Sequence, residues 1–293
     1  MTTIGFIGLG NMGRPMVANL IKAGHEVRSF DILADARNRA EELGATIAIN
    51  AAEAVLECDV AITMLPAGQD VRDVYIDHII DHVQVGTLLI DSSTIDVETA
   101  REVIRKADER GLMMIDAPVS GGIVGAEAGS LTFMCGGAKE AFDKAKPILE
   151  TMGKNIFHAG DSGAGQAVKA CNNLMLAIQM ISVCEGFSLA KKLDLDVQRL
   201  FDIVSTATSQ CWSLTSYCPV PGPVSTSPAN RDYAAGFTVA MMLKDLKIAQ
   251  EAAKLSGAHI PLGTLATEIY ETFAEDGGDR LDFSAIYRQI GGS

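Results

Sequence analysis

The sequence is poor in positive charge: 24 Lys and Arg stand against 37 Asp and Glu, and the formal net charge at pH 7 is -13. Nucleic acids and anionic membranes bind proteins that concentrate Lys and Arg on at least one face. We therefore expect neither a nucleic-acid partner nor a membrane partner. A small carboxylate remains possible as a ligand, because a few local basic residues can bind an anion whatever the global charge.

Clustered cysteines are also lacking. The chain has no Cys-x-x-Cys pair, and no His lies at metal-ligand spacing from a Cys. Such spacings are the usual signs of zinc sites and of disulfide frameworks. We expect reduced thiols and no bound metal. The isolated cysteines are Cys58, Cys135, Cys171, Cys184, Cys211 and Cys218.

Long hydrophobic runs are missing as well. The longest near-continuous apolar segment, 174–184, is interrupted by Gln179 and Ser182 and is shorter than the roughly 20 residues that span a membrane. Met1 leads directly into an apolar segment, without the basic start and cleavage site of a secretory signal. We expect a cytoplasmic protein.

What the sequence does contain is a regular alternation in its first half. Short apolar runs alternate with amphipathic stretches, which is typical of βαβ units and a parallel sheet. The predicted strands are 3–7, 26–30, 60–64, 88–91, 113–116 and 131–135. The predicted helices are 12–23, 34–43, 50–57, 96–110 and 139–151.

The second half has a different rhythm. From 166 to 192 apolar residues occur almost all round a helix, as in a helix that is buried on most sides. Further helices are predicted at 196–206, 239–256, 262–275 and 283–290, with no strand. A length of 293 residues also favours two domains. We place the boundary between residues 1–163 and 164–293.

A glycine-rich segment follows the first predicted strand. It reads Gly8-Leu-Gly10-Asn11-Met12-Gly13 and is followed by a predicted helix. This is the dinucleotide-binding fingerprint in its required context: the glycines allow a tight turn, close approach of the pyrophosphate and close packing of the helix. The alternative is a purely structural turn.

Asp31 stands at the end of the second predicted strand. An acidic residue about 20 positions after the glycines accepts hydrogen bonds from the ribose hydroxyls of NAD and repels a 2′-phosphate. Asp31 therefore favours NAD over NADP, with helix capping as its alternative role. The predicted fold class is an α/β Rossmann domain with a doubly wound, mostly parallel sheet, followed by an all-α domain.

One face of the helix that opens the second domain carries Lys169, Asn172 and Asn173, at spacings of three and four. Burying a lysine and two amides among apolar residues is costly without partners. A lysine in such surroundings can act as a general acid or base, and an asparagine can orient a substrate. The alternative is a solvated lysine whose neighbouring asparagines bond to backbone.

A second candidate segment is Ser120-Gly121-Gly122, directly after another predicted strand. The serine hydroxyl and the bare backbone amides can donate hydrogen bonds to a carboxylate. A tight turn without a ligand is the alternative.

These motifs together resemble the β-hydroxyacid dehydrogenase family, most closely its 3-hydroxyisobutyrate dehydrogenase branch. The resemblance covers nearly the whole chain and includes Lys244-Asp-Leu late in the sequence. It implies an active site in the cleft between the two domains, NAD as cofactor, a small carboxylate substrate, and homodimers or homotetramers.

The resemblance also implies roles for single residues. Lys169 is the catalytic acid and base, and Ser120, Gly121, Gly122 and Asn173 bind the substrate. The implied cofactor residues are Gly8, Gly10, Asn11, Met12, Gly13, Asp31, Leu65, Pro66, Asp70, Thr94 and Lys244. The implied reaction is oxidation of 3-hydroxyisobutyrate to methylmalonate semialdehyde, with L-serine dehydrogenase or tartronate semialdehyde (glycerate) reductase as the alternatives.

Overall fold

A computed structural model describes residues 1–291. The chain forms two compact units, Met1–Lys169 and a second unit that begins at Ala170. The division falls within helix α8 (Ala164–Lys192), whose first residue is also the first residue after the boundary predicted from sequence.

The first unit is built on a nine-stranded sheet in the order β3-β2-β1-β4-β5-β6-β8-β7, with β9 paired to β8. The strands from β3 to β6 are all parallel, whereas β8 runs antiparallel to β6 and β7. The order 3-2-1-4-5-6 is that of a dinucleotide-binding sheet. The strands are β1 (Thr3–Ile7), β2 (Glu26–Phe30), β3 (Thr46–Ile47), β4 (Val60–Thr63), β5 (Leu88–Asp91), β6 (Met113–Asp116), β7 (Val119–Ser120), β8 (Leu131–Gly136) and β9 (Gly153–Gly160).

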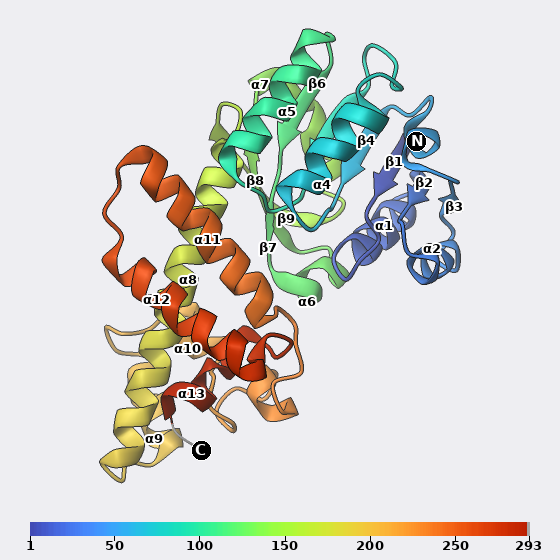
Figure 1. Ribbon diagram of the computed structural model, residues 1–293. Coiled ribbons are helices and arrows are strands. Elements are labelled where there is room, and N and C mark those ends of the chain that lie inside the picture. The colour runs from blue at the N-terminus through green and yellow to red at the C-terminus, as the bar shows by residue number, and fades with distance from the viewer. Residues whose placement is uncertain (292–293) are drawn as a thin grey trace. The chain divides into compact units, whose positions relative to one another are not determined.

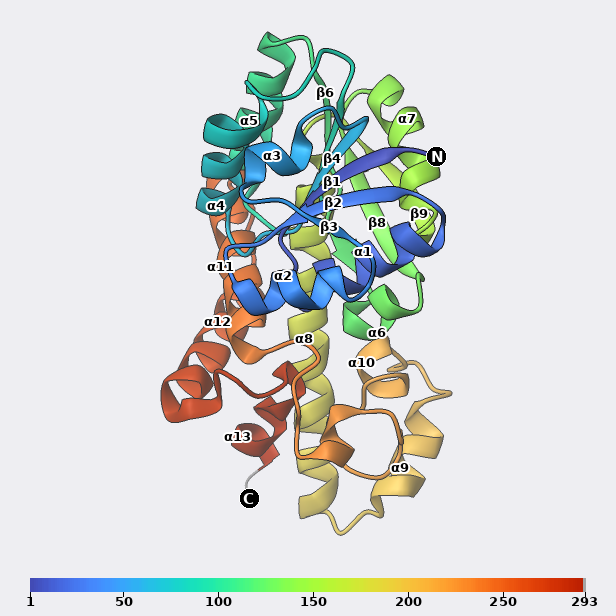
Figure 2. The ribbon, with the colours of Figure 1, turned by 90° about the vertical axis from the view of Figure 1, so that its right-hand side faces the viewer.

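Helices cover both faces of this sheet, which explains why its central strands are apolar throughout. Figure 2 shows α3, α4 and α5 on one face and α1 and α7 on the other. Each side has its own buried core, one around Phe6 and Phe133 and the other around Tyr75 and Leu89. The helices are α1 (Gly13–Lys22), α2 (Ala34–Glu41), α3 (Ala51–Val55), α4 (Gly68–Asp73) with a π-helical turn (Val74–Ile79), α5 (Val97–Glu109), α6 (Gly122–Glu127) and α7 (Lys139–Leu149).

The second unit is helical, and between 170 and 291 the only β-type pairing is an isolated bridge from Thr238 to Asp282. Its cores combine α8 with α11, α12 and the C-terminal turns. Besides α8 it contains α9 (Val197–Val204), α10 (Trp212–Thr215), α11 (Val239–Ser256), α12 (Pro261–Phe273), α13 (Tyr287–Gly291) and short 3-10 or π turns at Pro228–Arg231, Ala274–Gly278 and Phe283–Ile286. The predicted fold class is confirmed (Figure 1).

Helix α8 differs from the sequence expectation in one respect. The apolar stretch 174–184 alone is too short to span a membrane, but within residues 1–291 the whole 29-residue helix is long and apolar enough by length and composition. Its Ala177, Met180 and Cys184 are fully buried in the core of the second unit. The core helix of a soluble protein meets the same criteria by length and composition.

Candidate active site

The glycine loop connects β1 to α1, and its three glycines serve different purposes. Gly8 has φ of 97°, and a Cβ atom there would lie 2.3 Å from the carbonyl oxygen of Met64. A Cβ atom at Gly13 would lie 1.9 Å from the carbonyl oxygen of Gly8. Gly10, by contrast, has no atom within 4 Å of that position. Two glycines thus close the turn, and the third leaves space in front of it.

The start of α1 is suited to a phosphate. Met12 occupies its N-cap position without a capping side chain, and the first turn contains no acidic residue. The first N–H groups of a helix and the positive end of its dipole favour an anion. Asn11 and Gly10 are exposed at this point. The residues present therefore fit the pyrophosphate of a dinucleotide.

Asp31 lies directly after β2 and holds the glycine loop in place. Its Oδ2 accepts a hydrogen bond of 2.7 Å from Leu9 N, and its Oδ1 accepts one of 2.8 Å from Leu33 N. Each carboxylate oxygen can accept a second hydrogen bond, so Asp31 can still accept hydrogen bonds from the hydroxyls of a ribose. The bond to Leu33 ties Asp31 to the N-cap residue of α2, although no side chain caps that helix.

The loops after β4 and β5 carry Leu65, Pro66 and Thr94. Because β4 and β5 are parallel neighbours, both loops leave the sheet at the same edge. They are joined by a hydrogen bond of 2.8 Å from Leu65 N to Ser93 Oγ. Asp70 is exposed in the first turn of α4.

Beneath these loops is a buried polar network that the sequence did not indicate. Ser93 Oγ donates to Asp91 Oδ1 at 2.6 Å, and Thr63 Oγ1 donates to the same oxygen at 2.7 Å. The Thr63 hydroxyl is also hydrogen-bonded to that of Tyr75 at 3.0 Å. The second oxygen of Asp91, Oδ2, is buried without a hydrogen-bond partner. Burial raises the pKa of Asp91 to about 6 even though hydrogen bonds from Ser93 and Thr63 oppose the increase.

This raised pKa predicts a pH-dependent stability. A carboxyl that binds its proton more tightly when folded contributes stability below its unfolded pKa, and this contribution is lost as the pH rises through the folded pKa. Between the ordinary value of 3.8 and about 6, the loss should be about 3 kcal/mol, at about 1.4 kcal/mol per pKa unit. In urea unfolding followed by circular dichroism, the free-energy difference between wild type and Asp91→Asn should fall by most of that amount from pH 4 to pH 7. A constant difference would contradict it.

The candidate substrate segment, Ser120 to Gly122, runs from the end of β7 into the start of α6. Gly121 and Gly122 have φ of 132° and 62°, a pair of values that side chains other than glycine rarely adopt. Ser120 precedes them in β7, where it pairs with Thr132 of β8. A Cβ atom at Gly122 would meet no neighbour within 4 Å. The segment therefore presents bare backbone next to the serine hydroxyl.

Lys169 lies near the start of α8 and is 8% exposed. The first turn of this helix is fixed to β6, because Asp116 accepts hydrogen bonds from Gly163 N (2.8 Å) and Gln166 N (2.9 Å). Burial raises the pKa of Asp116 against the opposing effect of these bonds. The Gln166 side chain, in turn, binds the loop that carries Thr94. Within the first unit the structure thus places the turn before Lys169 beside a candidate cofactor loop.

Asn173 and Lys244 belong to the second unit, where both are associated with Asp245. Asn173 Nδ2 donates to Asp245 Oδ2, and Lys244 Nζ lies 3.3 Å from Asp245 Oδ1. Asn172 Nδ2 donates to Asn173 Oδ1 at 2.9 Å. Asp245, 3% exposed, was not singled out in the sequence, although it stands beside Lys244 in the late motif. It fixes the orientation of the Asn173 amide.

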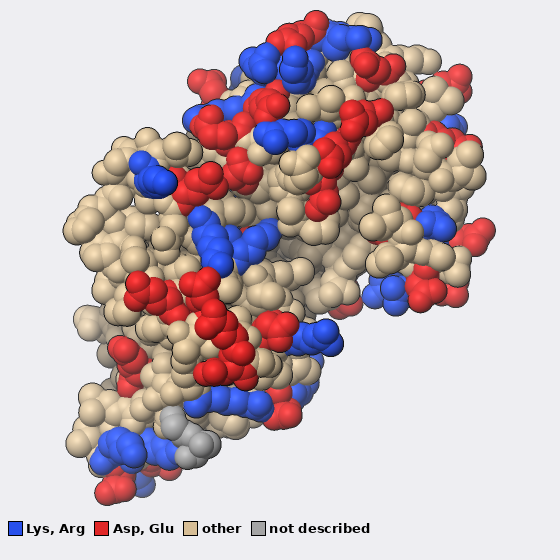
Figure 3. Space-filling view, in the orientation of Figure 1, with Lys and Arg blue, Asp and Glu red and all other residues tan. Residues whose placement is uncertain are grey.

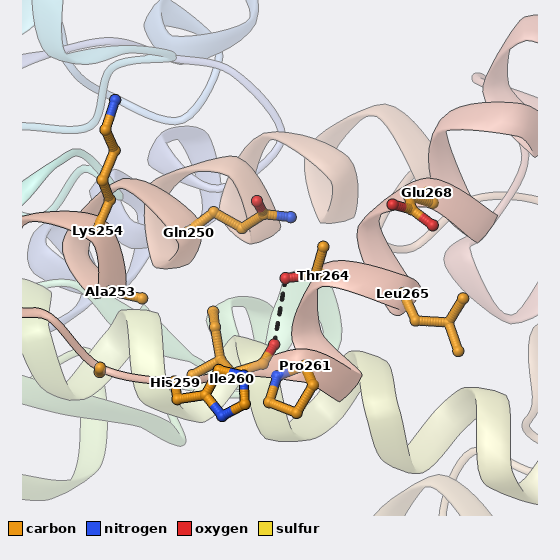
Figure 4. Close-up of a pocket in the computed structure, with 10 residues that line it drawn as sticks. Gln250, Ala253, Lys254, His259, Ile260, Pro261, Thr264, Leu265 and Glu268 are labelled. Carbon is orange, nitrogen blue, oxygen red and sulfur yellow. Dashed lines mark hydrogen bonds between the residues drawn. The ribbon is translucent and has the colours of Figure 1, made fainter.

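None of the predicted site residues lines the depression of about 530 Å³ between the end of α11 and the start of α12 (Figure 4). The bond drawn there, from Thr264 Oγ1 to the Ile260 carbonyl, belongs to the first turn of α12. Among residues 1–291, no three or more His, Cys, Asp or Glu side chains are grouped so that they could hold a metal. On the face in Figure 3, Lys and Arg are interspersed with Asp and Glu.

Two family models match the chain. Residues 3–160 match the NAD-binding domain of 6-phosphogluconate dehydrogenase, and residues 163–290 match the NAD-binding domain of NADP-dependent 3-hydroxyisobutyrate dehydrogenase. These matches confirm the predicted NAD-binding character of the chain.

Similar proteins agree with the models. The solved structure of 3-hydroxyisobutyrate dehydrogenase of Mycobacterium tuberculosis with L-serine is 51% identical, covers 99% of both chains and has a TM-score of 0.94. A 3-hydroxyisobutyrate dehydrogenase of Pseudomonas aeruginosa is 46% identical, and an NAD-dependent L-serine dehydrogenase of the same organism is 45% identical; each match covers 97–98% of both proteins. The chain therefore belongs to the 3-hydroxyisobutyrate dehydrogenase family of NAD-dependent oxidoreductases that act on a CH–OH group.

Proposed function

We propose that this protein oxidises the primary hydroxyl of 3-hydroxyisobutyrate to the aldehyde of methylmalonate semialdehyde. Bound NAD supplies the chemistry by accepting a hydride from the hydroxyl-bearing carbon. The observation that carries the proposal is the position of Lys169, a nearly buried lysine on a helical turn that is fixed to the Thr94 loop. Two relatives named 3-hydroxyisobutyrate dehydrogenase, at 51% and 46% identity, support the choice of substrate.

In this mechanism Lys169 takes the hydroxyl proton as the carbon loses its hydride, and in the reverse direction it returns the proton to the carbonyl oxygen. General acid–base catalysis of this kind typically contributes about 10²–10⁴-fold to the rate. The carboxylate of the substrate is assigned to Ser120, Gly121 and Gly122, whose hydroxyl and amides are the donors. Asn173, held by Asp245, is assigned to the substrate hydroxyl or to the lysine.

The cofactor roles are assigned to residues that follow the carboxyl ends of the parallel strands. Gly10 would leave room for the pyrophosphate beside the turn that Gly8 and Gly13 close. Asp31 would accept hydrogen bonds from the ribose hydroxyls, and the loops with Leu65, Pro66 and Thr94 would line the NAD site. The family resemblance assigns Lys244 to the cofactor or the substrate and gives Asp70 a weaker cofactor position. Assembly as a homodimer or homotetramer and a cytoplasmic location also remain predictions.

One alternative substrate has specific support. The similar Mycobacterium tuberculosis structure is that of the enzyme with L-serine, and an L-serine dehydrogenase is 45% identical to this chain. Glycerate, as in tartronate semialdehyde reductase, has the same hydroxymethyl group. 3-Hydroxyisobutyrate, L-serine and glycerate differ only in the substituent on the carbon next to the carboxylate. The pocket around that substituent would therefore decide between them.

The experiment is a substrate panel with purified protein. Formation of reduced cofactor is followed with 3-hydroxyisobutyrate, L-serine and glycerate, each with NAD and with NADP. We expect kcat/KM with NAD to be highest for 3-hydroxyisobutyrate. A higher value for L-serine or glycerate would overturn the substrate and keep the mechanism, whereas no activity with any of them would overturn the proposed function.

The preference for NAD should depend on Asp31. Asp31→Asn should lower the ratio of kcat/KM for NAD to that for NADP by about 10–100-fold, because hydrogen bonds to charged groups contribute about 1.5–3 kcal/mol and the repulsion of a 2′-phosphate is removed. Asparagine keeps one oxygen for the bond from Leu9 N. Asp35→Asn, an exposed change on α2, is the control. An unchanged ratio in Asp31→Asn would remove Asp31 from cofactor selection.

A further inference from the structure

Gln166 is one of the few buried polar side chains around the candidate site without an assigned role. It lies in the first turn of α8 and is 1% exposed. Its Oε1 accepts a hydrogen bond of 3.1 Å from Ile95 N, and its Nε2 donates one of 2.8 Å to the carbonyl oxygen of Ser93. The two bonds are made to the residues on either side of Thr94. The amide therefore fixes the backbone of this loop at two points.

The same residue is also attached to the sheet through its backbone. Gln166 N donates to Asp116 Oδ2 at 2.9 Å, while Gly163 N donates to Asp116 Oδ1 at 2.8 Å. The helix approaches β8 so closely that a Cβ atom at Gly165 would lie 2.2 Å from the Met134 carbonyl oxygen. The first turn of α8 is thus attached to β6, to β8 and to the loop after β5.

Lys169 follows Gln166 by three residues, so the two side chains lie on the same face of the helix. An α-helix is rigid over one turn, and a constraint on one residue is passed on to the next residue on that face. We infer that Gln166 is a positioning residue that sets the location of Lys169 relative to the loop of Thr94. This inference rests on the proposed function, in which Lys169 moves the proton and Thr94 lines the cofactor site.

The chemistry of the amide explains why glutamine is suited to this place. One partner, Ile95 N, is a donor and the other, the Ser93 carbonyl, is an acceptor, so the side chain must offer both kinds of atom. Methionine would fill a similar volume but would leave both backbone groups unpaired. An ionised carboxylate would pair with Ile95 N and repel the Ser93 carbonyl, whereas a protonated carboxyl could satisfy both.

The Ser93 loop has a second attachment that does not involve Gln166. Ser93 Oγ donates to Asp91 and accepts from Leu65 N. Loss of the amide should therefore displace Lys169 relative to the loop while the loop keeps its connection to β4 and β5. We expect cofactor affinity to be retained and the rate of the proton-transfer step to fall.

The test compares Gln166→Met with Gln179→Met, the same change farther along α8, where Gln179 has intermediate exposure. The number of NADH-binding sites is measured by fluorescence titration, and kcat is expressed per site. Gln166→Met should lower kcat per site at least tenfold, with less than a threefold change in the Kd for NADH. A normal kcat per site combined with fewer sites would mean a structural role only and would overturn the inference.

Two further readouts do not depend on the identity of the substrate. In Gln166→Met, hydrogen exchange at the Ile95 amide should accelerate, and the rate at which acetic anhydride modifies Lys169, followed by mass spectrometry, should change at least threefold relative to wild type. If wild type fails the substrate panel and both readouts still change, the proposed function fails and the positional link stands. If neither changes, the link itself is wrong.

Gln166→Glu provides the rescue by a conservative variant. Its carboxyl would take the place of the amide between Ile95 N and the Ser93 carbonyl. The charged groups of this region are Asp116 of β6, which bonds to the backbone N–H of residue 166, Asp91 of β5 and Lys169 of the same helix. Relative to wild type, its kcat per site should recover as the pH is lowered and the carboxyl regains its proton. If kcat per site of Gln166→Glu and of wild type changed in parallel with pH, the view that residue 166 must offer both a donor and an acceptor would be wrong.

Discussion

Lys169→Ala should lower kcat by about 10²–10⁴-fold, the usual contribution of a positioned acid or base. The side chain is nearly buried at the start of α8, and its loss removes the only candidate proton acceptor in the family motif. Binding of NADH should change little, because the glycine loop and Asp31 belong to separate elements. The measurement is kcat with 3-hydroxyisobutyrate together with the Kd for NADH by fluorescence titration.

Two variants sharpen this prediction. Lys169→Arg keeps a positive charge that does not titrate near neutral pH, so it should be as inactive as the alanine variant if proton transfer is what matters. Lys192→Ala changes an exposed lysine at the other end of the same helix and should be active. Turnover of Lys169→Ala within threefold of wild type would remove this lysine from the mechanism.

Gly13→Ala should destabilise the protein by at least about 4 kcal/mol, in the range reached only when a substitution breaks a specific structural feature. The new Cβ atom would overlap the Gly8 carbonyl oxygen at 1.9 Å, and that oxygen is backbone inside a tight turn, which cannot move aside as a side chain can. The expected observation is a large drop in urea midpoint or a failure to accumulate folded protein.

Gly10→Ala is the matched comparison three residues away. Nothing lies within 4 Å of its Cβ position, so its stability should remain within about 0.5 kcal/mol of wild type. If the space in front of Gly10 receives the pyrophosphate, this variant should nonetheless bind NADH at least tenfold more weakly. Equal stability for the two alanine variants, or unaltered NADH binding by Gly10→Ala, would contradict the roles assigned to the two glycines.

The central fold could be predicted from the sequence because its signals are local. β1, β2, β5 and β6 have the predicted bounds, since each is a short apolar run limited by turn residues. β3 and β7 are only two residues long and carry no periodicity. β9 is mostly exposed, at the edge of the sheet, and lacks the apolar pattern of a central strand. Helix α6, from Gly122 to Glu127, was not predicted either, because its glycines are unfavourable in a helix.

Candidate site residues could be proposed from the sequence only where they belong to a motif of fixed spacing. Although Gly8 packs against Met64 and Asp31 bonds to Leu9, the residues Gly8, Gly13 and Asp31 form a motif with a recognisable spacing. Asp91 and Gln166 do not: the hydrogen bonds that give them importance reach from Asp91 to Thr63, and from Gln166 to Ser93 and Ile95. Only the pairing of β4 with β5 and the position of α8 bring these groups together.

The central claim is that hydrogen passes directly from a β-hydroxy acid to NAD, and the most direct test follows that hydrogen. The enzyme is given NAD and 3-hydroxyisobutyrate carrying deuterium on the hydroxymethyl carbon, and the reduced cofactor is analysed by mass spectrometry and NMR. The account predicts one deuterium at C4 of the nicotinamide with the wild type, and almost none formed in the same time by Lys169→Ala. Reduced cofactor without deuterium, or none at all with the wild type, would contradict the account.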